Sequence, residues 1–226
     1  MQYAGASLGS IWFLLQGLLI LGLYIFVSER FLARGADFSH VLTGVLFWIP
    51  FSEMMQKSTV VLTENRAIIK RSGIGIDLFY WIPIVQMLFH FLLLSIPALT
   101  FLFWKGKLSY SFFIVFPFII FLAIVLFPIS RYLAMANVLL KDISPIIRLF
   151  LQIIFWTLPI VYVSPESIYS YLKFNPLFPC IQIFRSILLS GYEFYDILDL
   201  SNIIIINILI YIITNYNLKK QIADHI

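Results

Sequence analysis

Long apolar runs separated by short polar connections dominate this chain. A helix needs roughly 20 apolar residues to cross a bilayer, whereas the strands of a membrane barrel are only about ten residues long and alternate in polarity. The runs that are long enough for a crossing helix fall at about 8–27, 39–61, 80–104, 111–130, 146–163 and 200–216. The pattern therefore predicts an all-α membrane protein with six transmembrane helices, in which residues 1–226 form a single membrane domain.

The stretch after the fifth run, residues 164–190, has a different pattern. It is too apolar for a solvated loop, yet Pro165, Asn175-Pro176 and Pro179 divide it into pieces shorter than a bilayer crossing. Backbone at membrane depth must satisfy its own hydrogen bonds, so broken helices persist there only against protein or around a water-filled cavity. We therefore predict two short re-entrant or interfacial helices on the outer side, an architecture typical of a transport pathway.

The connection from Val61 to Asp77 predicts a short amphipathic helix at the inner membrane surface. Its apolar positions recur at helical spacing, at Val61, Leu62, Ile68 and Ile69. Its polar positions are Glu64, Asn65, Arg66, Lys70 and Arg71. Gly73 and Gly75 end the pattern. This segment is either the solvated end of a membrane helix or a lever held by a cytoplasmic protein.

Composition agrees with a membrane protein. Hydrophobic residues make up 62% and charged residues 12% of the chain, whereas about a quarter of a soluble domain is charged. The net charge of +4 fits an excess of cytoplasmic Lys and Arg, and no basic cluster with base-stacking neighbours predicts nucleic-acid binding. Placing both termini in the cytoplasm puts the larger share of Lys and Arg on the inner side.

The sequence lacks the motifs of an enzyme. The fragment Gly106-Lys107-Leu108-Ser109 has neither the spacing nor the context of a phosphate-binding loop, so we do not expect this chain to hydrolyse ATP. His40, His90 and His225 have no Cys or carboxylate at ligand spacing, so no metal site is predicted. The one cysteine, Cys180, excludes an intrachain disulfide.

Few polar residues fall inside the predicted spans. Glu53 is a functional candidate because ionisable groups at membrane depth usually face a bundle interior or a cavity. The simpler interpretation, which we favour, is an ion pair with Lys57 one turn away. Gln86 and His90 share one face of a helix and are expected to contact a neighbouring helix.

Aromatic residues crowd around the broken outer stretch. They are Tyr162, Tyr169, Tyr171, Phe174, Phe178 and Phe184. Aromatic faces stack on the C–H faces of sugars, so the cluster fits a glycan path, and ordinary packing explains it equally well.

Several short segments occur in an order found in one family. They are Tyr3–Trp12, Asn65–Arg71, Lys141-Asp142-Ile143, Leu158–Tyr162, Asn175-Pro176-Leu177 and the stretch from Phe184-Arg185 to Gly191. Together they resemble ABC-2 type transporter permeases over essentially the whole chain. The resemblance is greatest to the branch that exports O-antigen, capsular polysaccharide and teichoic acid.

The resemblance implies a homodimer in the bacterial cytoplasmic (inner) membrane, bound to two separate ABC ATPase subunits that hold ATP and Mg. It implies a lipid-linked glycan as substrate, with export of a drug or lipid as the alternative. The implied ATPase-coupling residues are Glu64, Asn65, Arg66, Lys70 and Arg71. The implied gate and substrate-path residues are Tyr162, Tyr169, Tyr171, Phe174, Asn175, Pro176, Phe178 and Arg185, and the Lys141-Asp142 pair is a family motif.

The sequence departs from the family pattern at three places. The chain begins inside the opening motif at Gln2-Tyr3, without the preceding amphipathic helix that family members usually have. Lys141 stands where Arg is usual, which replaces a bidentate fork by a single ammonium group. Gly73-Ile74-Gly75 replaces a region that often contains Phe-Pro.

Overall fold

The computed structural model describes residues 37–72, 75–164, 171–172, 175–191 and 200–214, together with residues 15, 17, 19, 20, 22, 23 and 26. Within these ranges the chain is helical and contains no strand. The α-helices are α2 (Phe38–Glu64), α3 (Arg66–Ser72), α4 (Ile82–Trp104), α5 (Val115–Leu139), α6 (Ile143–Thr157), α8 (Leu177–Leu188) and α9 (Ser201–Ile213). Two 3-10 helices, η1 (Ile76–Trp81) and η2 (Phe112–Ile114), lead into α4 and α5.

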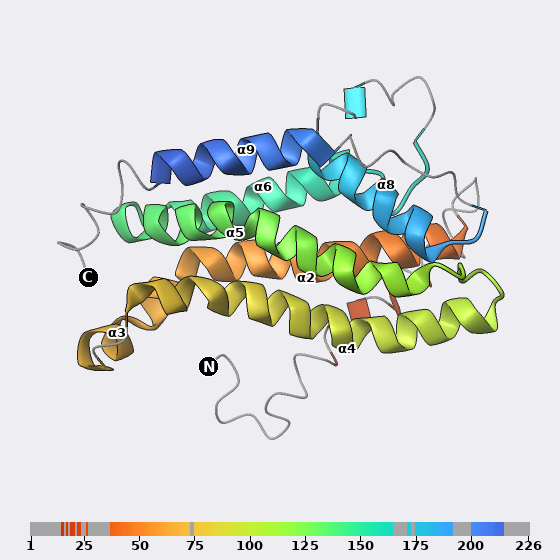
Figure 1. Cartoon of the computed structure of the whole chain (residues 1–226), viewed down its shortest axis with the longest axis horizontal. Coiled ribbons are helices and arrows are strands. Elements are labelled where there is room, and N and C mark those ends of the chain that lie inside the picture. Colours follow the sequence, from red (N-terminus) through yellow and green to blue (C-terminus); the bar gives the residue numbers. More distant parts are fainter. Residues whose placement is uncertain are drawn as a thin grey trace.

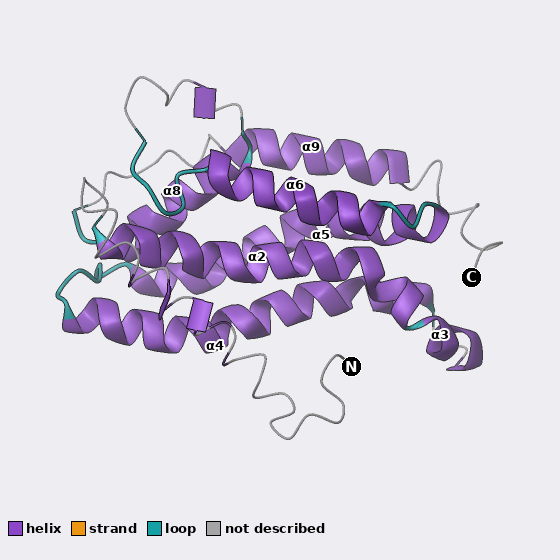
Figure 2. Cartoon of the chain, turned by 180° about the vertical axis from the view of Figure 1, so that it is seen from behind, coloured by secondary structure: helices purple, strands orange, loops and turns teal. Residues whose placement is uncertain are grey.

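Five long helices, α2, α4, α5, α6 and α9, run side by side along the longest axis (Figures 1 and 2). The central helix is α2, which packs against α4, α5, α6 and α8. Helix α3 projects at one end of the bundle, and α8 crosses the bundle at the other end (Figure 1). We call these the α3 end and the α8 end.

Length and composition make two helical stretches, Ile76–Trp104 and Phe112–Leu139, suitable for crossing a membrane. Helices α6, α8 and α9 are apolar but shorter. The all-helical class predicted from the sequence is therefore confirmed for the described residues. The six crossings stay a prediction, and most of the first one, at 8–27, lies outside the described residues.

The predicted run 111–130 continues as helix to Leu139, nine residues further than expected. The predicted run ended just before Arg131. In the structure Arg131 is buried, with its guanidinium 5.5 Å from the ring centre of Tyr80 and 4.0 Å from the carboxylate of Asp77. Tyr80 and Asp77 of the neighbouring η1 thus stabilise the buried guanidinium of Arg131 where η1 packs against α5.

The helix at the predicted run 146–163 extends from Ile143 to Thr157, so it begins three residues earlier and ends six residues earlier than predicted. Leu158 is extended, with ψ of 143°, because a residue before proline is disfavoured in the α conformation. At the other end the side-chain oxygen of Asn137 accepts a hydrogen bond of 3.0 Å from the backbone N–H of Ser144. This bond supplies one of the partners that the first turn of a helix lacks, so α6 begins before the apolar run does.

The main hydrophobic core lies between α2, α4, α5, α6 and α8, and every residue of α8 is buried. A smaller core at the α3 end contains Ile69, Tyr80 and Met135. Many large apolar side chains are also exposed on the outer surface, among them Phe103, Trp104, Phe113, Leu149 and Trp156. An apolar exterior of this extent is unusual for a soluble monomer and is suited to contact with lipid or protein.

Candidate functional site

Asn65 joins α2 to α3 at the end of the bundle where the sequence predicts a coupling helix. Its side-chain amide donates to the carbonyl oxygen of Val61 at 2.7 Å, which satisfies a carbonyl in the last turn of α2. Its own carbonyl oxygen accepts bonds from the N–H groups of Ile68 and Ile69, at 2.9 and 3.0 Å, in the first turn of α3. A single residue therefore ends one helix and begins the next, so the two helices are connected without a flexible loop.

The predicted amphipathic helix is present only in part, as α3. Val61, Leu62 and Glu64, which the pattern included, belong to the last turn of α2, and α3 begins at Arg66. Ile69 packs into the smaller core with Val61 and Leu62, as the apolar pattern predicts, whereas Ile68 is exposed. The side chains of Arg66, Lys70 and Arg71 are all exposed. The helix is thus anchored on one side and presents three cations and an isoleucine on the other, a combination that suits an acidic protein surface with an apolar centre.

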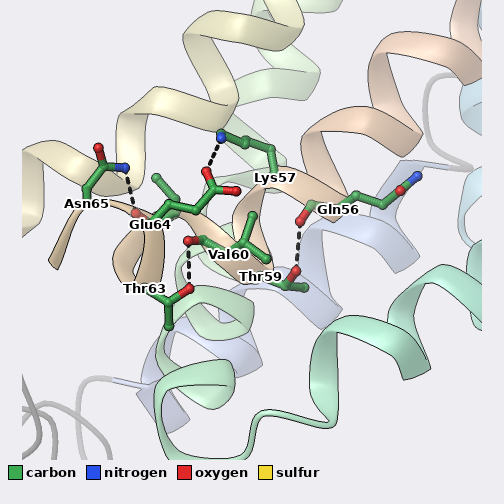
Figure 3. A network of polar contacts seen from close by, with 8 residues as sticks. Gln56, Lys57, Thr59, Val60, Thr63, Glu64 and Asn65 are labelled. Carbon is green, nitrogen blue, oxygen red and sulfur yellow. Dashed lines mark hydrogen bonds and ion pairs between the residues drawn. The ribbon is translucent and has the colours of Figure 1, made fainter. Parts of the chain in front are cut away.

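Glu64 is paired within α2. Its carboxylate forms an ion pair with the ammonium group of Lys57, seven residues earlier on α2 (Figure 3). Thr59 and Thr63 donate side-chain hydrogen bonds to the carbonyl oxygens of Gln56 and Val60 on the same helix (Figure 3). The last turns of α2 therefore satisfy their polar groups locally and leave the basic residues of α3 exposed.

Lys141 and Asp142 lie in the turn between α5 and α6, at the same end of the bundle as α3 (Figure 1). Both side chains are exposed. Asp142 makes no side-chain cap to α6, and the side chain of Asn137, in the last turn of α5, bonds to the first turn of α6 instead. The structure thus places Lys141 and Asp142 on the surface at the α3 end.

At the α8 end, the chain leaves α6 through a turn at Leu158–Ser164. The hydroxyl of Tyr162 donates to the carbonyl oxygens of Trp156 and Thr157, at 3.3 and 3.1 Å. These carbonyls belong to the last turn of α6 and have no partner within the helix. Tyr162 therefore caps α6 by folding back over it.

Arg185 on α8 is completely buried beneath this turn. One guanidinium nitrogen, Nη2, donates to the carbonyl oxygens of Pro159, Ile160 and His40, at 2.7, 3.1 and 3.2 Å. A buried charge is costly without polar partners, and here three backbone carbonyl dipoles lie against Nη2. Arg185 thus links α8, the turn after α6 and the first turn of α2.

Two residues to which the sequence analysis assigned no role complete this polar centre. The Nε2–H of His40 faces the carbonyl oxygens of Pro159 and Tyr162, at 3.2 and 3.0 Å. A Cβ atom on Gly44, one turn along α2, would lie 2.5 Å from the carbonyl oxygen of Ile160 and 2.6 Å from Nη2 of Arg185. Gly44 could have been noticed in the sequence, because a glycine within a predicted helix commonly permits another segment to approach closely.

The predicted gate residues occupy different environments. Tyr171 is exposed, Phe178 and Arg185 are fully buried, and Tyr162 is half-buried. The side-chain oxygen of Asn175 accepts a 3.0 Å bond from the N–H of Leu177, and Pro176 is the N-cap residue of α8. Tyr169 and Phe174 lie outside the described residues.

Glu53 does not pair with Lys57, as the simpler interpretation of the sequence expected. Its carboxylate lies 2.5 Å from Nδ1 of His90, a fully buried residue on α4, while Lys57 pairs with Glu64. The expectation that His90 contacts a neighbouring helix is confirmed. Its partner is the acidic residue of α2, because the His90 and Glu53 faces meet where α2 and α4 pack.

No protein-family model matches the chain. Two curated proteins from Klebsiella pneumoniae are similar to it, and each is named O-antigen export system permease protein RfbA. Each is 25% identical over 214 residues, an alignment that covers 90% of this chain and 83% of the relative. The similarity thus extends over nearly all of the helical bundle rather than over one segment.

Proposed function

We propose that the chain is the non-catalytic membrane permease subunit of an ATP-driven exporter of a lipid-linked polysaccharide, of the O-antigen, capsule or teichoic acid type. The observation that supports it is the similarity to two O-antigen export permeases along 90% of the chain. The apolar outer surface and the helices of crossing length fit a permease that is embedded in a bilayer.

The proposal includes the rest of the complex. Two copies of the chain form a homodimer in the bacterial inner membrane, with several crossings and both termini in the cytoplasm. Two ABC ATPase subunits bind ATP and Mg and dock on the α3 end. The exposed cations of α3 and the nearby Lys141-Asp142 motif form the docking surface, and the segments around α8 face the outside.

The helix α2 connects the two ends. It has 27 residues and is therefore about 40 Å long. Asn65 holds α3 at one end, while His40 and Gly44 contact the turn after α6 and Arg185 near the other end. A movement that the ATPase imposes on α3 would tilt α2 and change the contacts of the outer segment, a rigid-body transition of the hinge or shear kind.

The ATPase interface can be tested by charge reversal of Arg66, Lys70 and Arg71 to Glu. We expect the triple variant to lose the ATPase subunit and its ATP hydrolysis from the purified complex, since cations at the interface would become like charges. The control reverses Lys105, which is exposed at the opposite end, and this variant should retain both. A triple variant that retains a full complement of ATPase would refute the α3 interface.

The substrate can be tested by deleting the gene. Lipid-linked glycan should accumulate inside the cell and surface glycan should decrease, because synthesis continues without export. Normal surface glycan combined with altered tolerance to a drug, or altered lipid distribution, would contradict the glycan substrate and favour the alternative cargo.

A further inference from the structure

A cavity of about 500 Å³ lies between α2, α5, α6 and α9, next to the residues that precede α8. Its volume is within the range of small-molecule sites, roughly 300 to 1,000 Å³. Its lining includes Phe51 of α2, Leu126 of α5, Ile154 of α6 and Ile203 of α9. These side chains are apolar, so the cavity favours a hydrocarbon over water.

The cavity reaches the outer surface of the bundle between α6 and α9. Phe150 of α6 and Ile206 of α9 both line it, and they are also 54% and 41% exposed. The neighbouring exposed residues on these helices, Leu149 and Ile205, are apolar as well. A ligand could therefore enter from a lipid phase without crossing a polar layer.

One buried polar group at this cavity lacks a hydrogen-bond donor among the described residues. Asn207 of α9 lines the cavity and is only 4% exposed. Its amide nitrogen donates to the carbonyl oxygen of Ile203 at 2.9 Å, which fixes the orientation of the carboxamide. Among the described residues its side-chain oxygen has no hydrogen-bond partner. A buried acceptor of this kind requires a donor.

The donor is best supplied by the ligand itself. A single water held by Asn207 would need two to four polar partners, and the lining residues from α2, α5 and α6 are apolar. The other polar side chains at the cavity are those of Tyr171 and Asn175, and the side-chain oxygen of Asn175 already accepts a bond from the N–H of Leu177. A cavity of about 500 Å³ is in the size range of small-molecule sites, so it accommodates part of a hydrocarbon chain. The chemistry is that of a long hydrocarbon chain bearing a hydroxyl.

We propose that this cavity binds a hydroxylated single-chain lipid, whose hydrocarbon enters between Phe150 and Ile206 and whose hydroxyl donates to the side-chain oxygen of Asn207. The inference rests on the proposed function only in placing the chain in a bilayer. The predicted gate residues Tyr171, Asn175 and Pro176 border the same cavity, so its occupant would contact the outer segment directly.

The probe is a diazirine-labelled 1-hexadecanol, used with the purified full chain in detergent, and its comparison is the same label on hexadecane. We expect saturable photolabelling at cavity residues, with the alcohol at least tenfold more effective than the hydrocarbon. Asn207→Leu should lower labelling by the alcohol to the level of the hydrocarbon. Asn202→Leu, an exposed position on the same helix, should leave it unchanged.

Filling the cavity gives an independent readout. Ile206→Trp should reduce labelling by both probes at least tenfold, whereas Ile205→Trp, on the adjacent outward position, should not. If Ile206→Trp does not fold, Phe150→Trp and Leu149→Trp provide a second matched pair on α6. Equal labelling by alcohol and hydrocarbon, or unchanged labelling in Asn207→Leu, would overturn the site.

Lipids extracted from the purified chain identify the source of the ligand. A hydroxylated lipid that is retained in cells unable to make the glycan comes from the bilayer. One that disappears in those cells belongs to the exported molecule, and both results support the site. Retention of no hydroxylated single-chain lipid would overturn it. Because binding is measured without ATPase or export, loss of export with intact binding would contradict the proposed function alone.

Discussion

Nη2 of Arg185 lies 2.7 Å from the carbonyl oxygen of Pro159, so a side chain from α8 binds the backbone that leaves α6. The proline ends α6, because a residue before proline avoids the α conformation, and the carbonyls beyond it need partners. Arg185 supplies the donor and also reaches the carbonyl oxygen of His40 on α2. The break in the fifth apolar run is thus stabilised by a residue 26 positions further along the chain.

Replacing Arg185 by Met should destabilise the protein. The carbonyl oxygens of Pro159, Ile160 and His40 would lose their donor inside the core, and one hydrogen bond to a charged group contributes about 1.5–3 kcal/mol. The measurement is the midpoint of thermal unfolding in detergent. Arg148→Met, at an exposed position of α6, is the control and should change the free energy of unfolding by no more than about 0.5 kcal/mol. Equal midpoints for the two variants would show that the buried contacts contribute nothing.

Gly44→Ala should also be destabilising, by about 1–3 kcal/mol. The added methyl group would lie 2.5 Å from the backbone oxygen of Ile160, which cannot move without displacing the turn after α6. Gly22→Ala is the matched control, because no atom lies within 4 Å of a Cβ there, and replacing a helical glycine by alanine favours the helix. Unfolding of both variants in parallel measures the difference, and an alanine tolerated at position 44 would contradict the close approach of α2 to the turn.

Glu53 and His90 should be energetically coupled. A double-mutant cycle with Glu53→Leu and His90→Leu is expected to give an interaction energy of about 0.5–3 kcal/mol, since the two groups share one hydrogen bond between helices. A parallel cycle of Glu53→Leu with Lys57→Met should give almost none, because Lys57 pairs with Glu64 instead. A larger interaction energy for Glu53 and Lys57 than for Glu53 and His90 would contradict the pairing in the structure and support the one expected from the sequence.

Two substitutions of Tyr162 distinguish the role of its aromatic ring in export from the role of its hydroxyl in stability. Tyr162→Phe keeps the ring and removes the hydroxyl that caps α6, so it should lower stability by about 0.5–1.5 kcal/mol and leave export intact. Tyr162→Ala removes the ring as well and should slow export of the glycan while sparing assembly with the ATPase. The measurement is the rate of surface glycan appearance, with Tyr110→Ala as a control at an exposed aromatic position. Normal export by Tyr162→Ala would mean that the ring only packs.

The sequence predicted local features well. The helix at Arg66–Ser72 follows from the amphipathic pattern, and the end of α6 lies next to Pro159, although the predicted span ran on to residue 163. The extension of α5 past Arg131 was missed, because a charged residue ends a hydrophobic run in sequence whatever its partners are in space.

The sequence did not predict which polar side chains pair inside the bundle. From the sequence, Lys57 was the nearest cation to Glu53, whereas the folded chain brings His90 of another helix against it. The burial of Arg185 could not be read from the chain either, since its acceptors on Pro159 and His40 lie 26 and 145 positions away.

The sequence by itself determined the helical class and the basic face of α3, because apolar periodicity acts over a few neighbouring residues. The proline breaks were not all placed correctly, since Pro179, predicted to divide the outer stretch, lies within α8, whereas Pro159, inside a predicted span, ends α6. Only the tertiary structure decided which polar groups meet inside the bundle and where α2, α5, α6 and α9 leave a cavity. Those outcomes depend on how helices distant in sequence pack their surfaces together, and the pattern along any single helix does not contain that information.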